Sequence, residues 1–104
     1  MDYRVVVTPD AEDDFESFLT YLLFEKNNPQ AASHFIDDFE ATKKRLATVA
    51  GSIKLCDNDC LKQNGYRRLN FIEMDYFVLF RIVGDTVIID NIFHNLQDYE
   101  HKIY

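Results

Sequence analysis

The sequence predicts an α+β fold of the order β-αα-βββ, in which a helical hairpin packs on an antiparallel-type four-stranded sheet. Apolar residues recur at helical spacing in two consecutive segments between residues 9 and 50, whereas β-branched or alternating segments lie before and after them. Because helices and strands are segregated along the chain, a doubly wound α/β fold is disfavoured. The 104 residues suffice for one domain, at 1–104, with residues 96–104 as a short C-terminal helix or tail.

The first strand passes into the first helix at Thr8-Pro9. Residues 3–7 contain three consecutive valines and favour a strand. Thr8 can accept a hydrogen bond from the first N–H groups of a helix, and proline loses no bond at the first helical position. Carboxylates fill the first turn, where the helix dipole favours them: Asp10, Glu12, Asp13 and Asp14. The apolar stripe is Ala11, Phe15, Phe18, Leu19, Leu22 and Leu23.

A second helix is predicted to begin by the same device, with Asn28 as cap and Pro29 as the first helical residue. Its apolar stripe is Ala32, Phe35, Ile36, Phe39, Leu46 and Val49. Lys43, Lys44 and Arg45 are expected in its last turns, where the dipole favours cations. We expect Gly51 to end the helix in the left-handed conformation.

Three strands are predicted after the irregular stretch 52–65, at residues 66–72, 76–83 and 86–93. The two-residue loop Gly84-Asp85 predicts a tight hairpin that pairs Val83 with Thr86. The same register pairs Leu79 with Asp90, Phe77 with Ile92 and Asp75 with His94. One face is then almost wholly apolar and is assigned to the core: Tyr76, Val78, Phe80, Ile82, Val87, Ile89, Asn91 and Phe93. The other face is mixed and uncovered, and carries Arg68, Arg81 and His94.

The composition supports a packed core, since 47% of the residues are apolar and the aromatic residues comprise nine Phe and six Tyr. The net charge is −7, which repels phosphate at long range. That charge is uneven, with −8 over residues 1–40, +5 over 41–71 and −4 over 72–104. The basic middle segment therefore leaves a phosphate-bearing target compatible with the sequence.

Several classes of protein are disfavoured. No apolar run approaches the length needed to cross a membrane, and no signal segment opens the chain, so we expect a cytoplasmic protein. Cys56 and Cys60 are expected to be reduced thiols. A zinc site would need two further soft ligands, and the histidines are scattered, so we expect no metal and no cofactor.

The candidate catalytic residues are Arg68, Arg81 and His94, because the predicted register places them on one open face. Arginine binds phosphate in a bidentate way, and histidine exchanges a proton near neutral pH. RNA supplies its own nucleophile, the 2′-hydroxyl, so its cleavage needs a base, an acid and cations but no metal. Tyr99 could stack on a base, donate a proton or anchor the C-terminal segment. Simpler interpretations also stay open: an Arg81–Asp90 ion pair, an ordinary surface histidine at 94, and a solvated strand edge at Arg67-Arg68.

Five motifs carry a resemblance to a known family. They are Val7-Thr8-Pro9-Asp10-Ala11-Glu12-Asp13-Asp14, Asn28-Pro29-Gln30-Ala31-Ala32, Asn64-Gly65-Tyr66-Arg67-Arg68-Leu69, Tyr76-Phe77-Val78-Leu79-Phe80-Arg81-Ile82, and Ile89-Asp90-Asn91-Ile92-Phe93-His94 through Asp98-Tyr99. In this order the chain resembles, over nearly all its length, the RelE/ParE toxins of bacterial type II toxin–antitoxin modules, also called plasmid-stabilisation-system-like proteins. The resemblance implies a helical hairpin on an antiparallel sheet, growth inhibition, and neutralisation by a co-expressed antitoxin.

Two activities occur in that superfamily, and the resemblance leaves both open. RelE-like members cut messenger RNA in the ribosomal A site, and on that basis we predict an mRNA interferase with Arg68, Arg81, His94 and Tyr99 as catalytic residues. Lys54, Lys62 and Arg67 would then bind nucleic acid. ParE-like members poison DNA gyrase without enzymatic chemistry, and the segments Gly65–Arg68 and Phe80–Ile82 look ParE-like. A third alternative is a degenerate member that binds only its antitoxin. The expected partners are a cognate antitoxin, then the ribosome and mRNA or DNA gyrase, with a homodimer as a further option.

Overall fold

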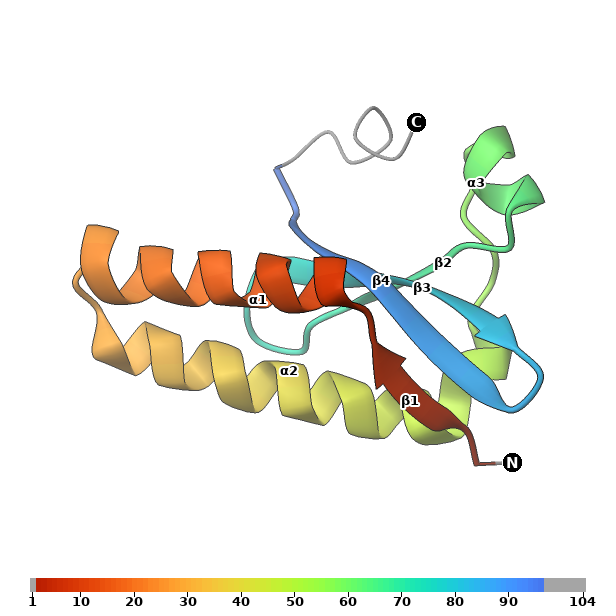
Figure 1. Cartoon of the computed structure of the whole chain (residues 1–104), viewed down its shortest axis with the longest axis horizontal. Coiled ribbons are helices and arrows are strands. Elements are labelled where there is room, and N and C mark those ends of the chain that lie inside the picture. The colour runs from red at the N-terminus through yellow and green to blue at the C-terminus, as the bar shows by residue number, and fades with distance from the viewer. Residues whose placement is uncertain (1, 97–104) are drawn as a thin grey trace.

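Two long helices lie on one face of a four-stranded sheet in the computed structural model, which describes residues 2–96 (Figure 1). The strands are β1 (Arg4–Val7), β2 (Arg67–Asn70), β3 (Tyr76–Val83) and β4 (Thr86–His94), in the sheet order β1-β4-β3-β2. The predicted α+β class and β-αα-βββ order are confirmed. β2, β3 and β4 are antiparallel neighbours, whereas β1 pairs with β4 in parallel, so the sheet is mixed. The long chain segment between β1 and β4 makes this parallel crossover feasible.

Both predicted helix caps are present. α1 (Pro9–Thr20) begins where the backbone N–H of Ala11 donates to Thr8 Oγ1 at 3.2 Å. α2 (Pro29–Val49) begins where the N–H of Ala31 donates to Asn28 Oδ1 at 3.1 Å. Between them α1 continues as one π-helical segment, η1 (Tyr21–Glu25). The start of each helix of the hairpin is therefore set by local side-chain chemistry.

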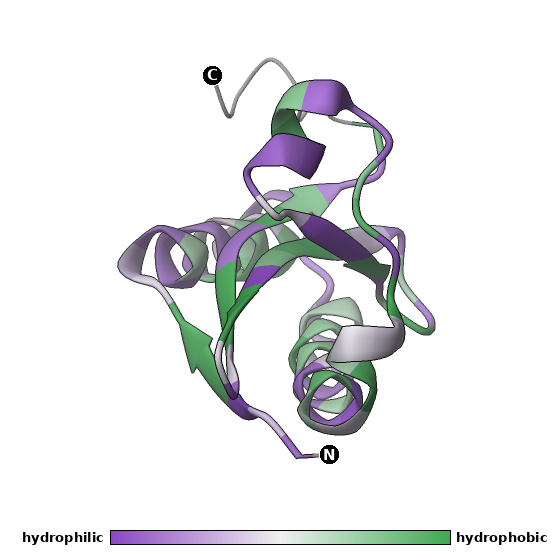
Figure 2. Cartoon of the chain, turned by 90° about the vertical axis from the view of Figure 1, so that its right-hand side faces the viewer, coloured by the Kyte–Doolittle hydropathy of each residue, from purple (hydrophilic) through white to green (hydrophobic). Residues whose placement is uncertain are grey.

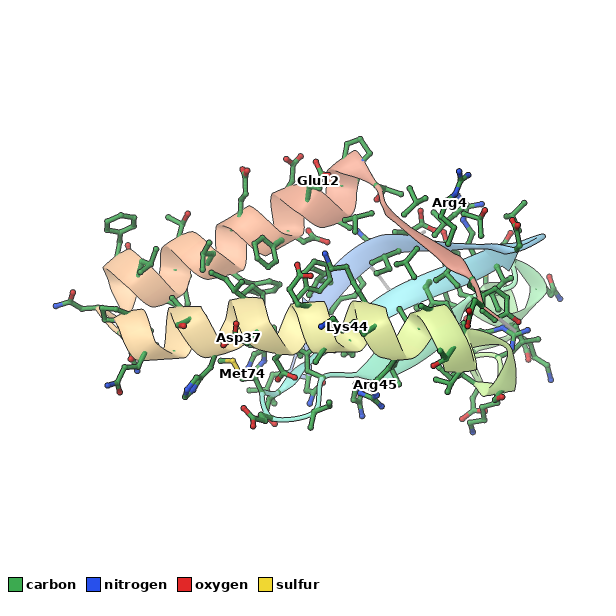
Figure 3. The ribbon with its side chains drawn as sticks, turned by 90° about the horizontal axis from the view of Figure 1, so that it is seen from below. Arg4, Glu12, Asp37, Lys44, Arg45 and Met74 are labelled. Atoms are coloured by element: carbon green, nitrogen blue, oxygen red, sulfur yellow. The ribbon has the colours of Figure 1, made fainter. Side chains whose placement is uncertain are left out.

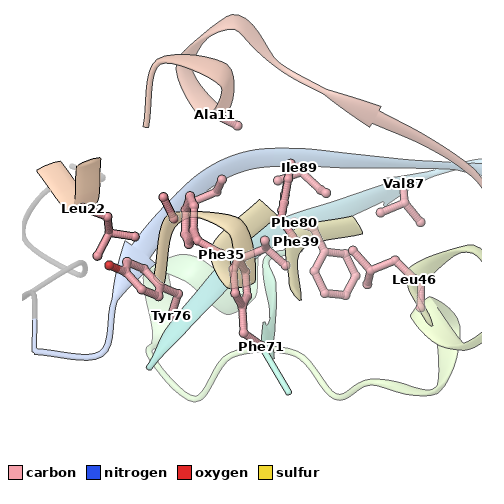
Figure 4. Packing of buried hydrophobic residues seen from close by; sticks show 14 residues of the cluster. Ala11, Leu22, Phe35, Phe39, Leu46, Phe71, Tyr76, Phe80, Val87 and Ile89 are labelled. Atoms are coloured by element: carbon pink, nitrogen blue, oxygen red, sulfur yellow. The ribbon is translucent and has the colours of Figure 1, made fainter. Parts of the chain in front are cut away.

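The core between the helices and the sheet is built around aromatic rings (Figure 4). The ring centroid of Phe35 lies 5.2 Å from that of Phe15, 5.7 Å from Phe71 and 4.8 Å from Tyr76. Such offset and tilted pairs add to the stabilisation from burial alone. These rings connect both helices to the start of β3.

The predicted apolar stripe of α2 is wrong at two positions. Ile36 and Val49 are 40% and 41% exposed, while Asp38 and Thr42 are buried. The buried face of α2 runs through residues 35, 38, 39, 42 and 46, which follow the three- and four-residue spacing of one helix face. Both polar side chains on this face hydrogen-bond to the backbone: Thr42 Oγ1 donates to the carbonyl of Asp38 at 2.8 Å, and Asp38 accepts from the loop after β2.

The end of α2 also differs from the prediction. Gly51 lies in the 3₁₀ turn η2 (Ala50–Ser52), and the glycines with positive φ are Gly65 and Gly84. A Cβ atom at position 51 would collide with the hydroxyl of Tyr3, so the glycine serves a close approach and not a left-handed cap.

The basic residues of α2 lie before its last turn, so they do not serve as dipole partners there. Lys43 Nζ pairs with Glu40 Oε1 at 2.8 Å, and Arg45 Nη1 donates to the carbonyl of Asn70 at 3.2 Å. Part of the basic segment therefore links α2 to its neighbours.

A short helix that the sequence analysis missed covers part of the second face of the sheet. α3 (Asp59–Gln63) begins where the N–H of Leu61 donates to Asn58 Oδ1 at 3.1 Å. Leu61 and Cys56 pack there against Phe77, Leu79 and Phe93. Figure 2 shows α2 and α3 on opposite sides of the sheet. The face predicted to be uncovered thus carries a second, smaller hydrophobic cluster.

Candidate functional site

A β-bulge between β3 and β4 decides which side chains share a face. The predicted register holds from Val83↔Thr86 to Phe80↔Ile89, but Leu79 pairs with Asn91 and not with Asp90. Asp90 is therefore the extra residue of the bulge. The predicted pairs Leu79–Asp90, Phe77–Ile92 and Asp75–His94 are wrong, because one inserted residue moves every later side chain of β4 to the other face.

His94 consequently lies on the helix side of the sheet, away from the arginines. It pairs with Tyr76, and the two rings make an edge-to-face contact with centroids 5.1 Å apart. The N–H of Leu96 donates to His94 Nδ1 at 3.2 Å. The prediction that His94 shares the open face with Arg68 and Arg81 is wrong for the same reason. Asn91 and Phe93 change faces with it, and Phe93 joins the second cluster beside Phe77.

Arg81 forms the ion pair that the sequence offered as its simpler interpretation. Its Nε lies 2.8 Å from Asp90 Oδ2, and the side chains of Arg81 and Asp90 are 39% and 16% exposed. The hydrogen bond to Asp90 raises the pKa of Arg81 further above its usual value. Burial raises the pKa of the neighbouring Tyr66 phenol, and the negative charge of Asp90 adds to that shift while Arg81 opposes it. Tyr66, Arg81 and Asp90 are thus one interacting group.

Arg68 lies on the same face as Arg81 but makes a different set of contacts. Its guanidinium carbon is 3.7 Å from the centroid of the Phe77 ring. Its Nε donates to Asn70 Oδ1 at 3.1 Å, and Nη2 donates to Asn95 Oδ1 at 3.4 Å. The stacking and the two amide contacts hold the planar group against the sheet.

The other predicted site residues do not gather around these arginines. Arg67 alternates to the helix side, where Nη1 donates to the carbonyls of Gly51 and Ile53. Lys54 is exposed and lies 3.3 Å from Asp57 Oδ1. Lys62 is exposed in the last turn of α3. Tyr99 lies outside the described residues.

Asp14 is a polar contact that the sequence analysis attributed only to the helix dipole. Its carboxylate leaves α1 toward β4 and accepts the N–H of Ile92 at 2.9 Å and Asn91 Nδ2 at 3.2 Å. Burial raises the pKa of Asp14, and the bond from Ile92 partly opposes this shift. A groove of about 690 Å³ adjoins it and is also lined by Asp10, Tyr66 and Asp90. No sequence signal distinguishes Asp14 from its acidic neighbours.

Two features of the described residues bear on the kind of protein. Between residues 2 and 96, no group of three His, Cys, Asp or Glu side chains is placed to hold a metal ion. In the same part of the chain, no helix has the length and apolar character to cross a bilayer.

The arrangement of a helical hairpin on a small mixed sheet is also the fold of chains in solved toxin–antitoxin complexes. One chain of the chromosomal ParDE system from P. aeruginosa shares the fold with a TM-score of 0.70 and 20% sequence identity, over 88% of this chain and 95% of that chain. One chain of the RelBE2 toxin–antitoxin complex from Mycobacterium tuberculosis gives a TM-score of 0.54 and 18% identity, over 90% and 99% of the two chains. No curated protein matches the chain by sequence.

The family model described as the ParE toxin of the type II toxin–antitoxin system, parDE, matches residues 5–99. The chain therefore belongs to the ParE toxin family. This family is part of the RelE/ParE superfamily, which the sequence motifs resemble. The chain is a toxin-family protein of type II toxin–antitoxin modules.

Proposed function

We propose that this protein is a ParE-like toxin that inhibits DNA gyrase by binding and not by cleaving RNA. The observation that carries the proposal is the separation of His94 from the arginines, because metal-independent cleavage at a 2′-hydroxyl needs its base or acid and its cations around one phosphate. His94 contacts Tyr76 on the helix side, whereas Arg81 and Arg68 lie on the other face. The family match supports the same branch.

The contacts of Arg81 add support. A guanidinium that stabilises a phosphorane must offer its N–H groups to the substrate. Arg81 Nε already donates to a largely buried carboxylate at 2.8 Å. This pair occupies the Nε donor of Arg81 and offsets part of its positive charge, which weakens the stabilisation that Arg81 could give to a phosphorane.

The antitoxin is the second part of the proposal. We propose that a cognate antitoxin binds the apolar cleft of about 670 Å³ between α1, η1 and the end of β3, which Phe18, Tyr21 and Tyr76 line. Tyr21 and the nearby Phe24 are 45% and 76% exposed, so apolar ring surface is accessible to a partner at this end of the hairpin. An amphipathic helix with spaced apolar anchors fits such a surface.

The target can be tested by inducing the protein without an antitoxin. We expect growth arrest with filamentation and DNA damage, and purified protein should trap or inhibit purified gyrase. Messenger RNA on the ribosome should remain intact. Ribosome-dependent cleavage that is lost in His94→Gln and Arg68→Ala would overturn the proposal in favour of the predicted mRNA interferase.

His94→Gln separates the two mechanisms most directly. The gyrase proposal expects this variant to arrest growth as the parent does, whereas an interferase that uses His94 should lose its activity. If the folded protein causes no growth arrest, no gyrase inhibition and no mRNA cleavage, both activities are contradicted. That result would favour a degenerate member that binds only its antitoxin.

A further inference from the structure

The two edges of the sheet are protected differently. Beyond the end of β1, the edge of β4 is capped by side chains: Asp14 accepts the N–H of Ile92 at 2.9 Å, and Thr8 Oγ1 donates to the carbonyl of Asp90 at 3.1 Å. Such capping prevents the addition of another strand. At the opposite edge, the described residues pair with the first part of β2 through one antiparallel bridge, between Leu55 and Arg67, and Arg45 Nη1 donates to the Asn70 carbonyl at 3.2 Å.

The backbone of β2 offers hydrogen-bonding groups on its outer side. In an antiparallel ladder, alternate residues bond to the neighbouring strand and the residues between them face away. The N–H of Phe71 donates to the carbonyl of Tyr76 at 2.8 Å, so the odd-numbered residues of this strand face β3. The even-numbered residues face outward, as the bond from Cys56 N–H to the Tyr66 carbonyl at 2.9 Å confirms. Asn70 belongs to this outward-facing set: its carbonyl accepts Arg45 Nη1 at 3.2 Å, and its N–H points away from β3.

A groove of about 660 Å³ follows this outer edge. Residues 54–58 form one wall, residues 68–72 form the other, and Arg45 of α2 closes one side. Figure 3 shows Arg45 on the same side of α2 as Met74, which belongs to the connection after β2. Ile72 lines the groove and is 62% exposed, so an apolar contact is available as well.

The charge of the groove is opposite to that of the chain. Arg45, Lys54 and Arg68 line it together with a single acid, Asp57. The groove at the capped β4 edge contains three aspartates and no base: Asp10, Asp14 and Asp90. In a protein of net charge −7, the β2 edge is thus a local cationic surface that also presents strand backbone.

We propose that the edge of β2 binds an extended, acidic segment of another protein, which adds to the sheet as a fifth strand. Main-chain bonds to outward groups such as the N–H of Asn70 supply part of the affinity, and carboxylates on every second residue reach Arg68 and Lys54. A single-stranded nucleic acid would meet the same cations, but it would leave the strand backbone without matching groups. The inference does not depend on the gyrase proposal, because it assigns no target.

The first test uses the full chain and a fluorescein-labelled peptide of alternating Glu and Val, with both ends blocked. We expect saturable binding that weakens as salt rises, together with slower hydrogen exchange at the Asn70 amide. A Lys-Val peptide should not bind. A Glu-Val peptide that is N-methylated at alternate residues should lose at least about tenfold in affinity. Equal affinity of the methylated peptide, or no binding of the parent peptide, overturns the proposal.

The second test uses charge variants. Lys54 is 81% exposed, so Lys54→Glu should leave the fold intact and weaken binding about tenfold. The control is Lys26→Glu, at the far end of the helical hairpin, which should bind as the parent does. Asn70→Pro removes the outward N–H on an edge strand that tolerates proline, whereas Asn70→Ala removes only the side-chain acceptor of Arg68 Nε, so the proline variant should bind more weakly than the alanine variant. Unchanged affinity in both Lys54→Glu and Asn70→Pro, or tighter binding of an oligouridylate than of the peptide, overturns the strand-addition proposal.

Discussion

The carboxylate of Asp90 holds the guanidinium of Arg81 at 2.8 Å, across the point where β4 gains one residue relative to β3. The bulge places Asp90 out of the regular ladder and toward Arg81 and Tyr66. A cation that the sequence offers for phosphate chemistry is thereby engaged within the protein. The pair therefore offsets the positive charge of Arg81 on the second face of the sheet.

Breaking the Arg81–Asp90 pair should lower the stability of the folded protein. We expect Arg81→Gln to lower the free energy of unfolding by roughly 1 kcal/mol, because Asp90 is largely buried and loses a charged donor while Arg81 is partly screened by solvent. A double-mutant cycle with Asp90→Asn, followed by urea denaturation, measures the coupling. If the two changes prove additive, the pair contributes nothing beyond its separate side chains.

The sequence predicted what local chemistry decides. Thr8 and Asn28 each combine a side-chain acceptor with a following proline, and both cap a helix. The Gly84-Asp85 loop likewise predicted the first hairpin pairs correctly, and Gly84 has a φ of 61°. These features depend on a few neighbouring residues, so they can be identified without tertiary structure.

The sequence did not reveal the β-bulge at Asp90, which changes the faces of the residues after it. Nothing in Ile89-Asp90-Asn91 marks a bulge, yet the bulge moves His94 to the helix side and Phe93 to the second cluster. The covering of that cluster by Leu61 depends on long-range packing, although the Asn58-Asp59 pair could have signalled the start of α3. The sequence therefore placed Arg68 and Arg81 on the same face correctly, but it placed His94 on the wrong face.

Substitution of Asp38 should strongly destabilise the protein. It is 4% exposed, and its two oxygens accept the N–H groups of Ile72 at 3.0 Å, Glu73 at 3.0 Å and Met74 at 2.8 Å. Asp38→Ala leaves these backbone donors without that acceptor, and we expect a loss of about 2–4 kcal/mol. Chemical denaturation measures the loss, and hydrogen exchange at residues 72–74 should accelerate.

The neighbouring Asp37 provides the matched control, since it is exposed on the same helix. Asp37→Ala should change stability by no more than about 0.5 kcal/mol. Equal effects at the two positions would show that the three bonds to Asp38 do not stabilise the connection between β2 and β3.

Asp14 should make the wild-type protein less stable as the pH rises from the acid side toward neutrality. Its pKa is raised in the folded protein, chiefly by burial, so the folded state binds a proton more tightly than the unfolded state. The resulting stabilisation is present below the unfolded pKa and is lost as the pH rises through the folded pKa. Asp14→Asn can still accept the N–H of Ile92 and should remove this contribution.

The measurement is the free energy of unfolding of both proteins as a function of pH. The stability of Asp14→Asn relative to the wild type should be greater at neutral pH than in acid. Parallel pH profiles for wild type and Asp14→Asn would contradict the assigned role of burial.

Gly51 should be sensitive to substitution because of Tyr3 and not because of its backbone conformation. A Cβ at position 51 would meet the Tyr3 hydroxyl, whereas Gly65 has a φ of 78° and open space around its Cβ position. Gly51→Ala should therefore cost about 1 kcal/mol in urea denaturation, and Tyr3→Phe should relieve most of that cost by removing the colliding oxygen. Gly65→Ala, used as the comparison, should cost a similar amount that Tyr3→Phe leaves unchanged, because its strain resides in the left-handed backbone. If Tyr3→Phe fails to relieve Gly51→Ala, packing against Tyr3 is not what requires a glycine at the end of α2.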